Sequence, residues 1–372
     1  MGGEPMSKSP VKIGIVLPLS GAEELFGSQG LQGAKMAVAE INASGGVLAG
    51  RPVELVVEDE KTDLKTAVEK TEKVILKDRV IAVMGPTSSA HRNAMIEICT
   101  KYKTPLLYAT DYEGGCCYRY LFCYSPIPDH YVKPLIPYLM KKSGKSFFVI
   151  GADYVWPIKI GEAVKKEVLK LGGSIAGEEF LPFDTKDFKT NLQRIVHSKA
   201  DHVVMMLLGA DGQIFIKQFA ALGLKKNITL TVMAFNENYM VGLTQEEVEG
   251  IVTCAPFLGN LDRAEARDFV SRQKKMFGRN TVVSYFAESH YGLIMFLKNA
   301  MEKAKTDDKE KVIDAMGDQT LVVGNGPVTL RASDHHMILN MLIAEVKTGE
   351  LVMTKYIGPV APADQCAGRK KV

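Results

Sequence analysis

The stretch Arg79 to Ala94, RVIAVMGPTSSAHRNA, decides the fold. Val80 to Met84 is an unbroken apolar run, typical of a strand buried on both faces, and Gly85-Pro86 ends it before a helical apolar period begins near Ala94. Thr87-Ser88-Ser89 lies between strand and helix, where the first N–H groups of a helix are unpaired. These hydroxyls therefore either bind a carboxylate, an amide oxygen or a phosphate, or simply cap the helix.

Length and charge limit the classes of protein. The chain has 372 residues, 46% of them hydrophobic, which is enough for two domains with separate cores. A net charge of +3 leaves no basic field, so we expect no nucleic-acid partner. No apolar run approaches the roughly 20 residues that span a bilayer, and MGGEPMSKSP lacks the apolar part of a signal peptide. Residues 1–10 are interpreted as a cloning remnant or as the N-terminus left after cleavage.

The cysteines are few but clustered. Six cysteines without a C-x-x-C spacing indicate neither a disulfide scaffold nor a zinc ribbon. Cys116, Cys117 and Cys123 fall within a short predicted loop. Either one local disulfide fixes this loop in an oxidising compartment, or all three are reduced and buried.

Strands and helices alternate regularly around the opening stretch. Strands are predicted at 11–17, 51–59, 80–84 and 104–110, and helices at 33–41, 63–78 and 93–102. Gly21, Gly27 and Gly30 predict a loop before the first helix. This spacing favours right-handed crossovers and a parallel sheet.

The alternation restarts after YSPIPD, residues 124–129, where we place a hinge. The pattern predicts an α/β protein of two doubly wound parallel-sheet lobes joined by a multi-crossing hinge, which closes on a small ligand. The predicted ranges are 11–124 plus 255–330 for the N-terminal lobe, 125–254 plus 331–357 for the C-terminal lobe, and a tail at 358–372.

Polar and aromatic side chains follow the predicted strand ends. In parallel sheets, ligands bind beyond the carboxyl ends of the strands, which is where Ser20, Ser88, Ser89 and Thr110 fall. Aromatic residues near such ends would form the walls of a pocket: Tyr108, Tyr112, Tyr154, Trp156 and Phe257. Glu237, in the second lobe, is either a carboxylate for an ammonium or amide N–H₂ group, or a solvated loop residue.

The common catalytic motifs are missing. The sequence has no G-x-S-x-G, no Walker A and no H-E-x-x-H, and no G-x-G-x-x-G follows a predicted strand. His335-His336 lies in a predicted polar turn, which explains the pair more simply than a metal site does. We therefore expect a binding protein without enzymatic activity, cofactor or metal.

Several segments resemble one known family. They are VKIGIVLPLSG from Val11, GAKMAVAEINASGGVLAGRPVELVVED from Gly33, GPTSSAHRNA from Gly85 and GPVTL from Gly326. Over residues 11 to 357 they resemble the type I periplasmic binding proteins of the leucine/isoleucine/valine type. TDYEGG at 110–115, GADYVWP at 151–157 and FAESHYG at 286–292 are similar to the amide- and urea-binding branch, which includes a cytoplasmic amide-sensing regulator.

The resemblance implies roles for residues of the first lobe. Ser89, next to Ser88 in the strand–helix turn, would hold the oxygen of the ligand. Thr110 and the backbone that follows Tyr108, at Ala109, would assist it.

It also implies roles for residues of the second lobe. Tyr154 would close on the ligand, Trp156 takes a place that is aromatic in the amide binders, and Glu237 would face the amino end of the ligand.

Asp111 departs from the family pattern, because the amide binders tend to have an apolar residue or proline there.

Two functions follow as expectations. The first is a periplasmic receptor, with its signal peptide removed, that delivers an amino acid, a short amide or urea to a membrane ABC permease. The second is a cytoplasmic regulator that senses an amide with the same cleft. The sequence leaves the ligand and the oligomeric state open.

Overall fold

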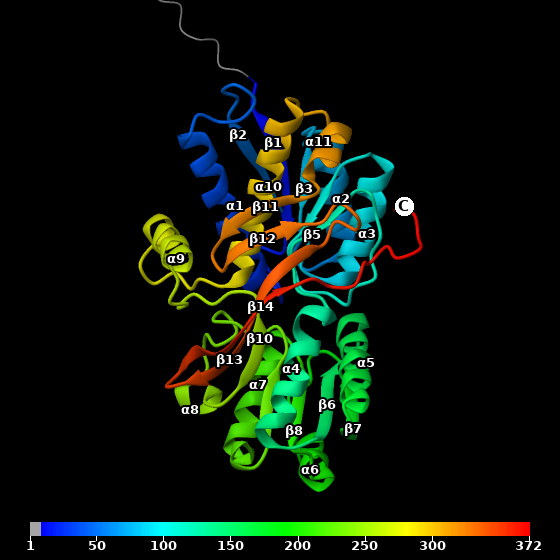
Figure 1. The fold of residues 1–372 in the computed structure, drawn as a ribbon, viewed down its shortest axis with the longest axis vertical. Coiled ribbons are helices and arrows are strands. Elements are labelled where there is room, and N and C mark those ends of the chain that lie inside the picture. Colours follow the sequence, from blue (N-terminus) through cyan, green and yellow to red (C-terminus); the bar gives the residue numbers. More distant parts are fainter. Residues whose placement is uncertain (1–8) are drawn as a thin grey trace, which may run out of the picture.

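The computed structural model describes residues 9–372 as two α/β lobes, one above the other in Figure 1. The upper lobe is built on a parallel sheet of order β2-β1-β3-β4-β5. Its strands are β1 (Val11–Leu17), β2 (Val53–Asp59), β3 (Ala82–Met84), β4 (Leu106–Tyr108) and β5 (Leu121–Cys123). Its helices are α1 (Glu24–Ala43), α2 (Leu64–Leu76), α3 (Ser89–Lys101), α9 (Ala264–Phe277), α10 (Tyr285–Ala304) and α11 (Lys309–Met316).

The lower lobe repeats the parallel winding around strands β6 to β10. The strands are β6 (Ser146–Ala152), β7 (Ser174–Leu181), β8 (His202–Met206), β9 (Thr229–Val232) and β10 (Val252–Ala255). The helices are α4 (Pro128–Ser143), α5 (Val155–Lys170), α6 (Lys189–Ser198), α7 (Gly209–Ala221), α8 (Gln245–Val248) and the 3₁₀ turn η1 (Leu224–Lys226). The predicted fold class of two doubly wound lobes is confirmed.

Antiparallel strands extend the second sheet. Its order is β11-β12-β13-β10-β9-β8-β6-β7, with β14 paired to β13. These additions are β11 (Gln319–Val323), β12 (Gly326–Leu330), β13 (Met337–Lys347) and β14 (Glu350–Val360). The hairpin of β13 and β14 turns at Thr348-Gly349, and β14 continues three residues into the segment predicted to be a tail.

Helix α1 begins nine residues before the predicted helix, so the prediction of a loop is confirmed for Gly21 but wrong for Gly27 and Gly30. A Cβ atom on Gly27 would lie 2.0 Å from the Pro18 carbonyl oxygen, and one on Gly33 would lie 2.1 Å from the Ala287 carbonyl oxygen. These glycines let α1 pack closely against the chain after β1 and against α10. Close packing, not a turn, explains the glycine spacing.

The chain crosses between the lobes four times: after β5, after β10, from β12 into β13, and back along β14 to the C-terminal segment, where Cys366 is bonded to Cys117 of the upper lobe (Figure 1). The first and third crossings are tied together, because the Cys123 N–H donates to the His335 carbonyl at 2.9 Å. This arrangement agrees with a multi-crossing hinge. The exact boundaries of the lobes remain a prediction.

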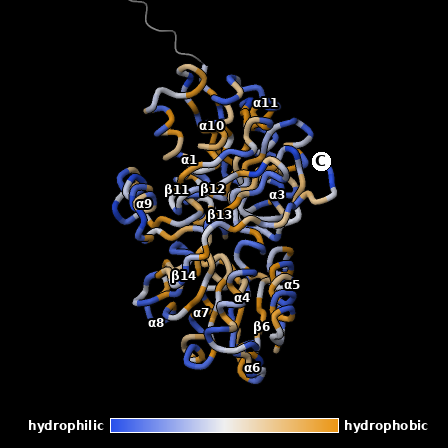
Figure 2. Tube along the Cα trace, viewed as in Figure 1, coloured by the Kyte–Doolittle hydropathy of each residue, from blue (hydrophilic) through white to orange (hydrophobic). Residues whose placement is uncertain are grey.

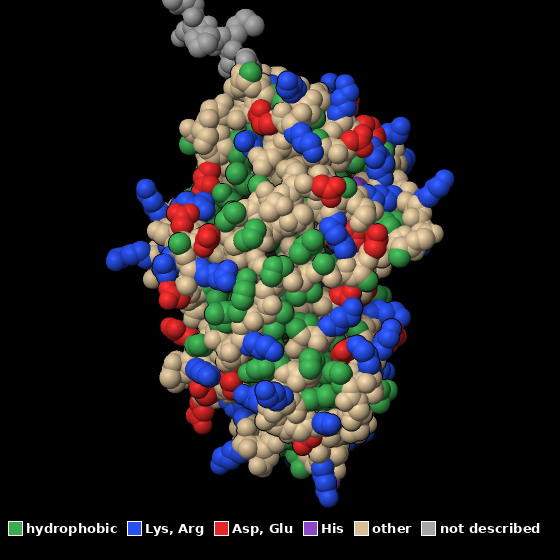
Figure 3. Space-filling view, viewed as in Figure 1, with side chains coloured by type: hydrophobic (Ala, Val, Ile, Leu, Met, Phe, Trp, Pro, Cys, Tyr) green, Lys and Arg blue, Asp and Glu red, His purple; other side chains and the backbone are tan. Residues whose placement is uncertain are grey.

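The hydrophobic residues lie mostly inside both lobes (Figure 2). On the face drawn in Figure 3, hydrophobic side chains also gather across the middle of the molecule, while Lys and Arg are spread among Asp and Glu. Val322, Met353 and Tyr356 are among the exposed apolar side chains of β11 and β14. Within residues 9–372, no helix is sufficiently long and apolar to cross a membrane.

The cysteine prediction is wrong in both of its forms. Cys117 forms a disulfide with Cys366 of the C-terminal segment, across 249 residues, while Cys116 and Cys123 stay free. The local cluster of cysteines does not reveal this pairing, because Cys366 lies near the other end of the sequence. In the folded chain the Cα atoms of Cys117 and Cys366 are 5.0 Å apart.

A buried carboxyl beside the first crossing makes stability depend on pH. Glu288 is buried on α10 and accepts a hydrogen bond from the Tyr124 hydroxyl at 3.0 Å. Burial raises the pKa of Glu288 from 4.5 to about 8, so the stability present below pH 4.5 is lost as the pH rises towards 8.

We expect Glu288→Gln, which mimics the protonated carboxyl, to have the same free energy of unfolding as the wild type at pH 5. At pH 9 the variant should exceed it by about 2 to 4 kcal/mol in the free energy of unfolding. Urea unfolding at pH 5, 7 and 9 measures this, with exposed Glu265→Gln as the control. The same difference at all three pH values would contradict the prediction.

Candidate ligand-binding cleft

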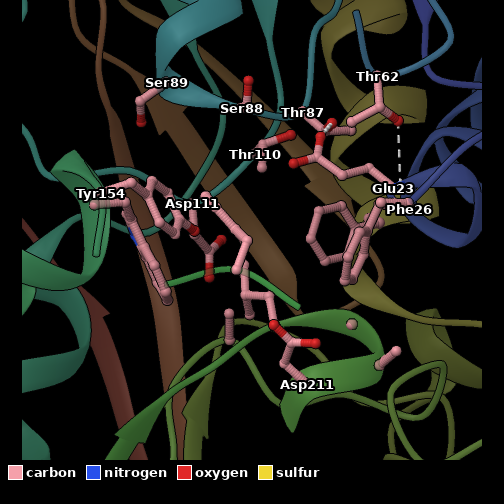
Figure 4. A pocket seen from close by; sticks show the side chains of 18 of the residues that line it. Glu23, Phe26, Thr62, Thr87, Ser88, Ser89, Thr110, Asp111, Tyr154 and Asp211 are labelled. Atoms are coloured by element: carbon pink, nitrogen blue, oxygen red, sulfur yellow. Dashed lines mark hydrogen bonds between the residues drawn. The ribbon is translucent and has the colours of Figure 1, made fainter. Parts of the chain in front are cut away.

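A cavity of about 380 Å³ lies between the two lobes. Figure 4 shows Ser88, Ser89 and Thr110 on one side and Asp211 on the other, with Tyr154 at one end and Phe26 at the opposite end. The upper lobe contributes Ala22, Glu23, Phe26, Thr62, Thr87, Ser88, Ser89, Thr110, Asp111 and Phe286. The lower lobe contributes Tyr154, Trp156, Phe183, Asp184, Leu208, Gly209, Ala210, Asp211 and Ala234.

The first turn of α3 faces the cavity. Ser88 is the N-cap, and its hydroxyl accepts a hydrogen bond from the His91 N–H at 3.3 Å. The N–H groups of Ser89 and Ala90 have no partner within the helix, as at any helix start. The predicted capping role is therefore found at Ser88, and the turn also lines a cavity, while its role in binding a ligand stays a prediction.

The Ser89 hydroxyl already has a partner. It donates to Glu113 Oε2 at 2.7 Å and accepts from Arg92 Nη1 at 3.3 Å. Arg92 Nη2 in turn donates to Glu113 Oε1 at 2.7 Å. Because the hydroxyl proton is taken, Ser89 offers an incoming oxygen its backbone N–H, while Arg92 and Glu113 hold the side chain in place.

Four acidic residues line the cavity, Glu23, Asp111, Asp184 and Asp211, and none of the lining residues is Lys, Arg or His. Burial raises the pKa of Glu23, whose carboxylate accepts a hydrogen bond from Thr87. Burial also raises the pKa of Asp111 to about 7, although the Tyr285 hydroxyl donates to its Oδ2 at 2.9 Å. Asp211 Oδ2 accepts from the Asp184 N–H at 2.8 Å. The lining therefore disfavours a ligand that is only anionic.

Aromatic rings supply the apolar part of the lining. Tyr154 stacks on Phe183 with ring centroids 5.2 Å apart and lies 6.5 Å from Trp156. On the other side, Phe26 and Phe286 lie 5.1 Å apart. Rings from both lobes thus form apolar walls of the cavity, as in most small-molecule sites.

The structure brings together Ser88, Ser89, Thr110, Tyr154 and Trp156 in this cavity. Tyr108 and Ala109 are buried beneath the cavity and do not line it. The Tyr108 hydroxyl donates to the Thr87 carbonyl at 3.4 Å, and the Ala109 carbonyl accepts from Ser289 at 3.2 Å.

Glu237 also lies outside the cavity. Its Oε1 accepts a hydrogen bond from the Gly259 N–H at 2.6 Å, and it lines a separate hollow with Met240 and Lys274. Burial raises the pKa of Glu237 to about 7. The chain turns away from the cavity after Ala234, so the carboxylate expected to face an amino group faces the hinge crossing instead.

Sequence reasoning missed Glu23, Phe26, Phe183, Asp184 and Asp211. Glu23 and Phe26 fall in the segment that was predicted to be a loop, and Asp184 has a left-handed backbone with φ of 63°. The one available signal was position, because these residues follow strands β1, β7 and β8 as Ser89 follows β3.

The histidine pair is structural. His335 and His336 are buried in the third crossing, and burial lowers their pKa values to about 3 and about 4. Among residues 9–372, no group of three or more His, Cys, Asp and Glu side chains is placed to hold a metal ion.

The fold and the cleft define the class of two-lobed binding proteins that enclose a ligand at the hinge. The chain belongs to the periplasmic binding protein family, whose model matches residues 10–350.

Relatives found by sequence similarity are named as Leu/Ile/Val-binding proteins. The Leu/Ile/Val-binding protein BraC3 of Rhizobium johnstonii is 25% identical over 327 residues, which are 84% of this chain and 85% of the relative. The Leu/Ile/Val-binding protein homolog 6 of Brucella melitensis is 22% identical over 90% of this chain and 87% of its own length.

Solved structures share the fold. A solute binding protein of an ABC transporter from Rhodopseudomonas palustris, in complex with 3,4-dihydroxybenzoic acid, has a TM-score of 0.85 at 20% identity and covers 96% of this chain and 99% of its own. The branched-chain amino acid transporter substrate binding protein LivJ from Streptococcus pneumoniae, in complex with isoleucine, has a TM-score of 0.83 at 22% identity, with coverages of 94% and 100%.

Proposed function

We propose that this protein is the extracytoplasmic solute-binding component of an ABC importer, and that it traps a small solute by closure of its two lobes. The observation that carries the proposal is the single cavity in which the first turn of α3, from one lobe, faces Tyr154 and Trp156 from the other. A cleft shared by two hinged lobes couples ligand binding to closure. The family and the names of the relatives support the transport role.

The lining favours a solute with an apolar body and a hydrogen-bonding head. The head would meet the N–H groups at the start of α3 together with Ser88 and Thr110, and the body would lie against the rings. A branched-chain amino acid and a short aliphatic amide fit this description better than urea, which has no apolar body. A hydroxylated aromatic acid is the second candidate: the rings on both walls support it, and the acidic lining opposes its carboxylate.

The disulfide supports the extracytoplasmic location over a cytoplasmic regulator. Cys117–Cys366 joins distant parts of the chain, and such bonds persist in oxidising compartments and are rare in the cytosol.

The experiment uses Trp156, which is the only tryptophan of the chain and lines the cavity. We expect its fluorescence to change when a solute binds. Titration with isoleucine, isobutyramide, urea and 4-hydroxybenzoate, repeated by calorimetry, separates the candidates. If none of them changes the fluorescence or produces heat, the proposal fails.

We expect Tyr154→Ala to weaken binding of the preferred solute by about 10-fold or more, because a buried aromatic wall contributes about 1.5 to 3 kcal/mol. Calorimetry measures the loss, since the change also alters the surroundings of Trp156. Leu169→Ala, an exposed position on α5, is the matched control and should leave the affinity unchanged. Equal affinities in the two variants would contradict closure of Tyr154 on the solute.

A further inference from the structure

Glu23 places a carboxyl group in the cleft at the start of α1. It is the N-cap residue of this helix, but its side chain forms no capping hydrogen bond. The side chain instead lines the cavity, where Glu23 Oε2 accepts a hydrogen bond from the Thr87 hydroxyl. The carboxyl group therefore faces the cavity and does not serve the start of the helix.

The second oxygen of this carboxyl group is free and accessible. Among residues 9–372, Glu23 Oε1 has no hydrogen-bond partner, and it is not one of the unpartnered polar atoms that are shut off from solvent. Asp111 differs, because its Oδ1 is shut off and its Oδ2 accepts from the Tyr285 hydroxyl at 2.9 Å. Of these two carboxyl groups, only that of Glu23 offers an oxygen to a solute.

Glu23 also lacks a counter-ion, since no Lys, Arg or His among residues 9–372 forms an ion pair with it. The nearest candidate is His91, but its Nδ1 is bonded to Glu60 Oε2 at 2.8 Å. Burial raises the pKa of Glu23, and the Thr87 hydrogen bond and the charge of His91 oppose this only in part. Asp211, in the opposite wall, has Lys186 Nζ 3.6 Å from its Oδ1.

Aromatic rings flank the same part of the cavity. Phe26 lies one turn along α1, where its N–H donates to the Glu23 carbonyl at 3.0 Å, and Figure 4 shows the two side chains next to each other. The ring centroids of Phe26 and Phe286 are 5.1 Å apart. The face of an aromatic ring attracts a cation and offers nothing to an anion.

A charge that is largely withdrawn from water is costly unless an opposite charge accompanies it. An anionic group at this wall would be repelled by Glu23, and the lining contains no Lys, Arg or His to compensate. A neutral amide could donate to Glu23 Oε1 but would leave the charge without a counter-ion. A cationic group supplies both the hydrogen bond and the opposite charge.

We propose that Glu23 determines the charge specificity of the cleft, and that the solute carries a cationic nitrogen group, an ammonium, amidinium or guanidinium, which pairs with Glu23 beside Phe26. This inference rests on the proposed function and names the chemical class of its solute. The cationic group donates to Glu23 Oε1 and lies against the Phe26 ring, while the Thr87 hydroxyl holds Oε2 in place.

The test uses three probes of nearly equal shape and different charge: benzamidine, which is a cation at neutral pH, neutral benzamide and anionic benzoate. Calorimetry of the wild-type protein should show that benzamidine binds at least about 10-fold more tightly than benzamide, and that benzoate binds most weakly. Equal affinities for benzamidine and benzamide would overturn the inference.

Glu23→Gln keeps the shape of the side chain and an oxygen that accepts from Thr87, but it removes the charge. Benzamidine should lose about 10-fold or more in affinity, while benzamide should change by less than about 3-fold. Glu24→Gln is the matched control, because Glu24 is the adjacent acidic residue, is exposed and does not line the cavity. It should leave both affinities unchanged. Circular dichroism confirms that both variants are folded.

The inference and the proposed function fail separately. If isoleucine, isobutyramide or 4-hydroxybenzoate binds and benzamidine does not, the inference is overturned while the proposed function stands. The same holds if Glu23→Gln weakens benzamidine and benzamide equally. If neither these solutes nor the three probes bind, both are overturned.

Discussion

Glu113→Leu should lower the free energy of unfolding by about 3 to 5 kcal/mol, because it leaves the Arg92 guanidinium buried without its counter-ion. Arg92 is 1% exposed, and its Nη2 lies 2.7 Å from Glu113 Oε1. The rings of Tyr108 and Tyr112 lie 5.1 and 4.5 Å from the guanidinium, but they do not replace a full negative charge. Urea unfolding followed by circular dichroism measures the loss.

The double variant Arg92→Met/Glu113→Leu distinguishes the lost charge from lost packing. Replacing both partners of a buried ion pair with apolar residues of similar volume is often nearly neutral, so this variant should regain at least half of the loss. The control is Glu162→Gln, since Glu162 pairs with Lys159 in a half-exposed salt bridge and should cost less than about 1 kcal/mol. A double variant no more stable than Glu113→Leu would show that the guanidinium itself supports the rings.

The same variants report on the cleft. Ser89 Oγ loses its acceptor whenever Glu113 is replaced, whether or not Arg92 is also changed. Solute binding should therefore weaken in both the single and the double variant by roughly the contribution of one hydrogen bond, about 0.5 to 1.5 kcal/mol. If binding recovered together with stability in the double variant, Glu113 would have no positioning role at Ser89.

The parallel sheets could be predicted because periodicity and glycine or proline ends are local signals. They placed β3 within two residues, and they placed Ser88, Ser89, Thr110 and Tyr154 after strands that end on one cleft. This worked because parallel strands end at the same edge of a sheet, so succession along the chain translates into proximity.

Glycine and carboxylate positions could not be interpreted in this way. Gly27 and Gly33 are small because α1 packs on other segments of the chain, a contact that no neighbouring residue in the sequence reveals. Glu237 and Asp211 both follow strands of the lower lobe, but only the direction of the chain after each strand decides that Asp211 reaches the cavity. The acidic character of the cavity could therefore not be predicted from the sequence, because it depends on which carboxylates the tertiary structure brings to the lining.

The disulfide, too, could not be predicted from the sequence, because it joins residues that are far apart along the chain. Cys366 lies in a polar segment with no pattern of its own, and only the folded chain places it next to Cys117. The segment is held by further contacts, since the Gly115 N–H donates to Gln365 Oε1 at 2.6 Å and the Arg119 N–H donates to the Val372 carbonyl at 2.8 Å. These bonds hold the loop that carries Asp111 and Glu113.

Cys117→Ser/Cys366→Ser should lower the free energy of unfolding by about 2 to 5 kcal/mol, because loss of the bridge frees the unfolded chain from a large closed loop. It should also weaken solute binding, since the loop between β4 and β5 loses its attachment to the C-terminal segment. Cys116→Ser is the control, because Cys116 is the adjacent free thiol and should change stability by less than about 1 kcal/mol. Urea unfolding and calorimetry measure the two effects.

Alkylation of the unfolded protein decides whether the bridge exists in the molecule as isolated. Without reductant, four of the six cysteines should react, and with reductant all six. Reaction of all six without reductant would show that the disulfide is absent. The proposal that the protein works in an oxidising compartment would then lose the support of the disulfide. An intact bridge whose loss leaves both stability and binding unchanged would instead show that the C-terminal segment stays in place through its hydrogen bonds alone.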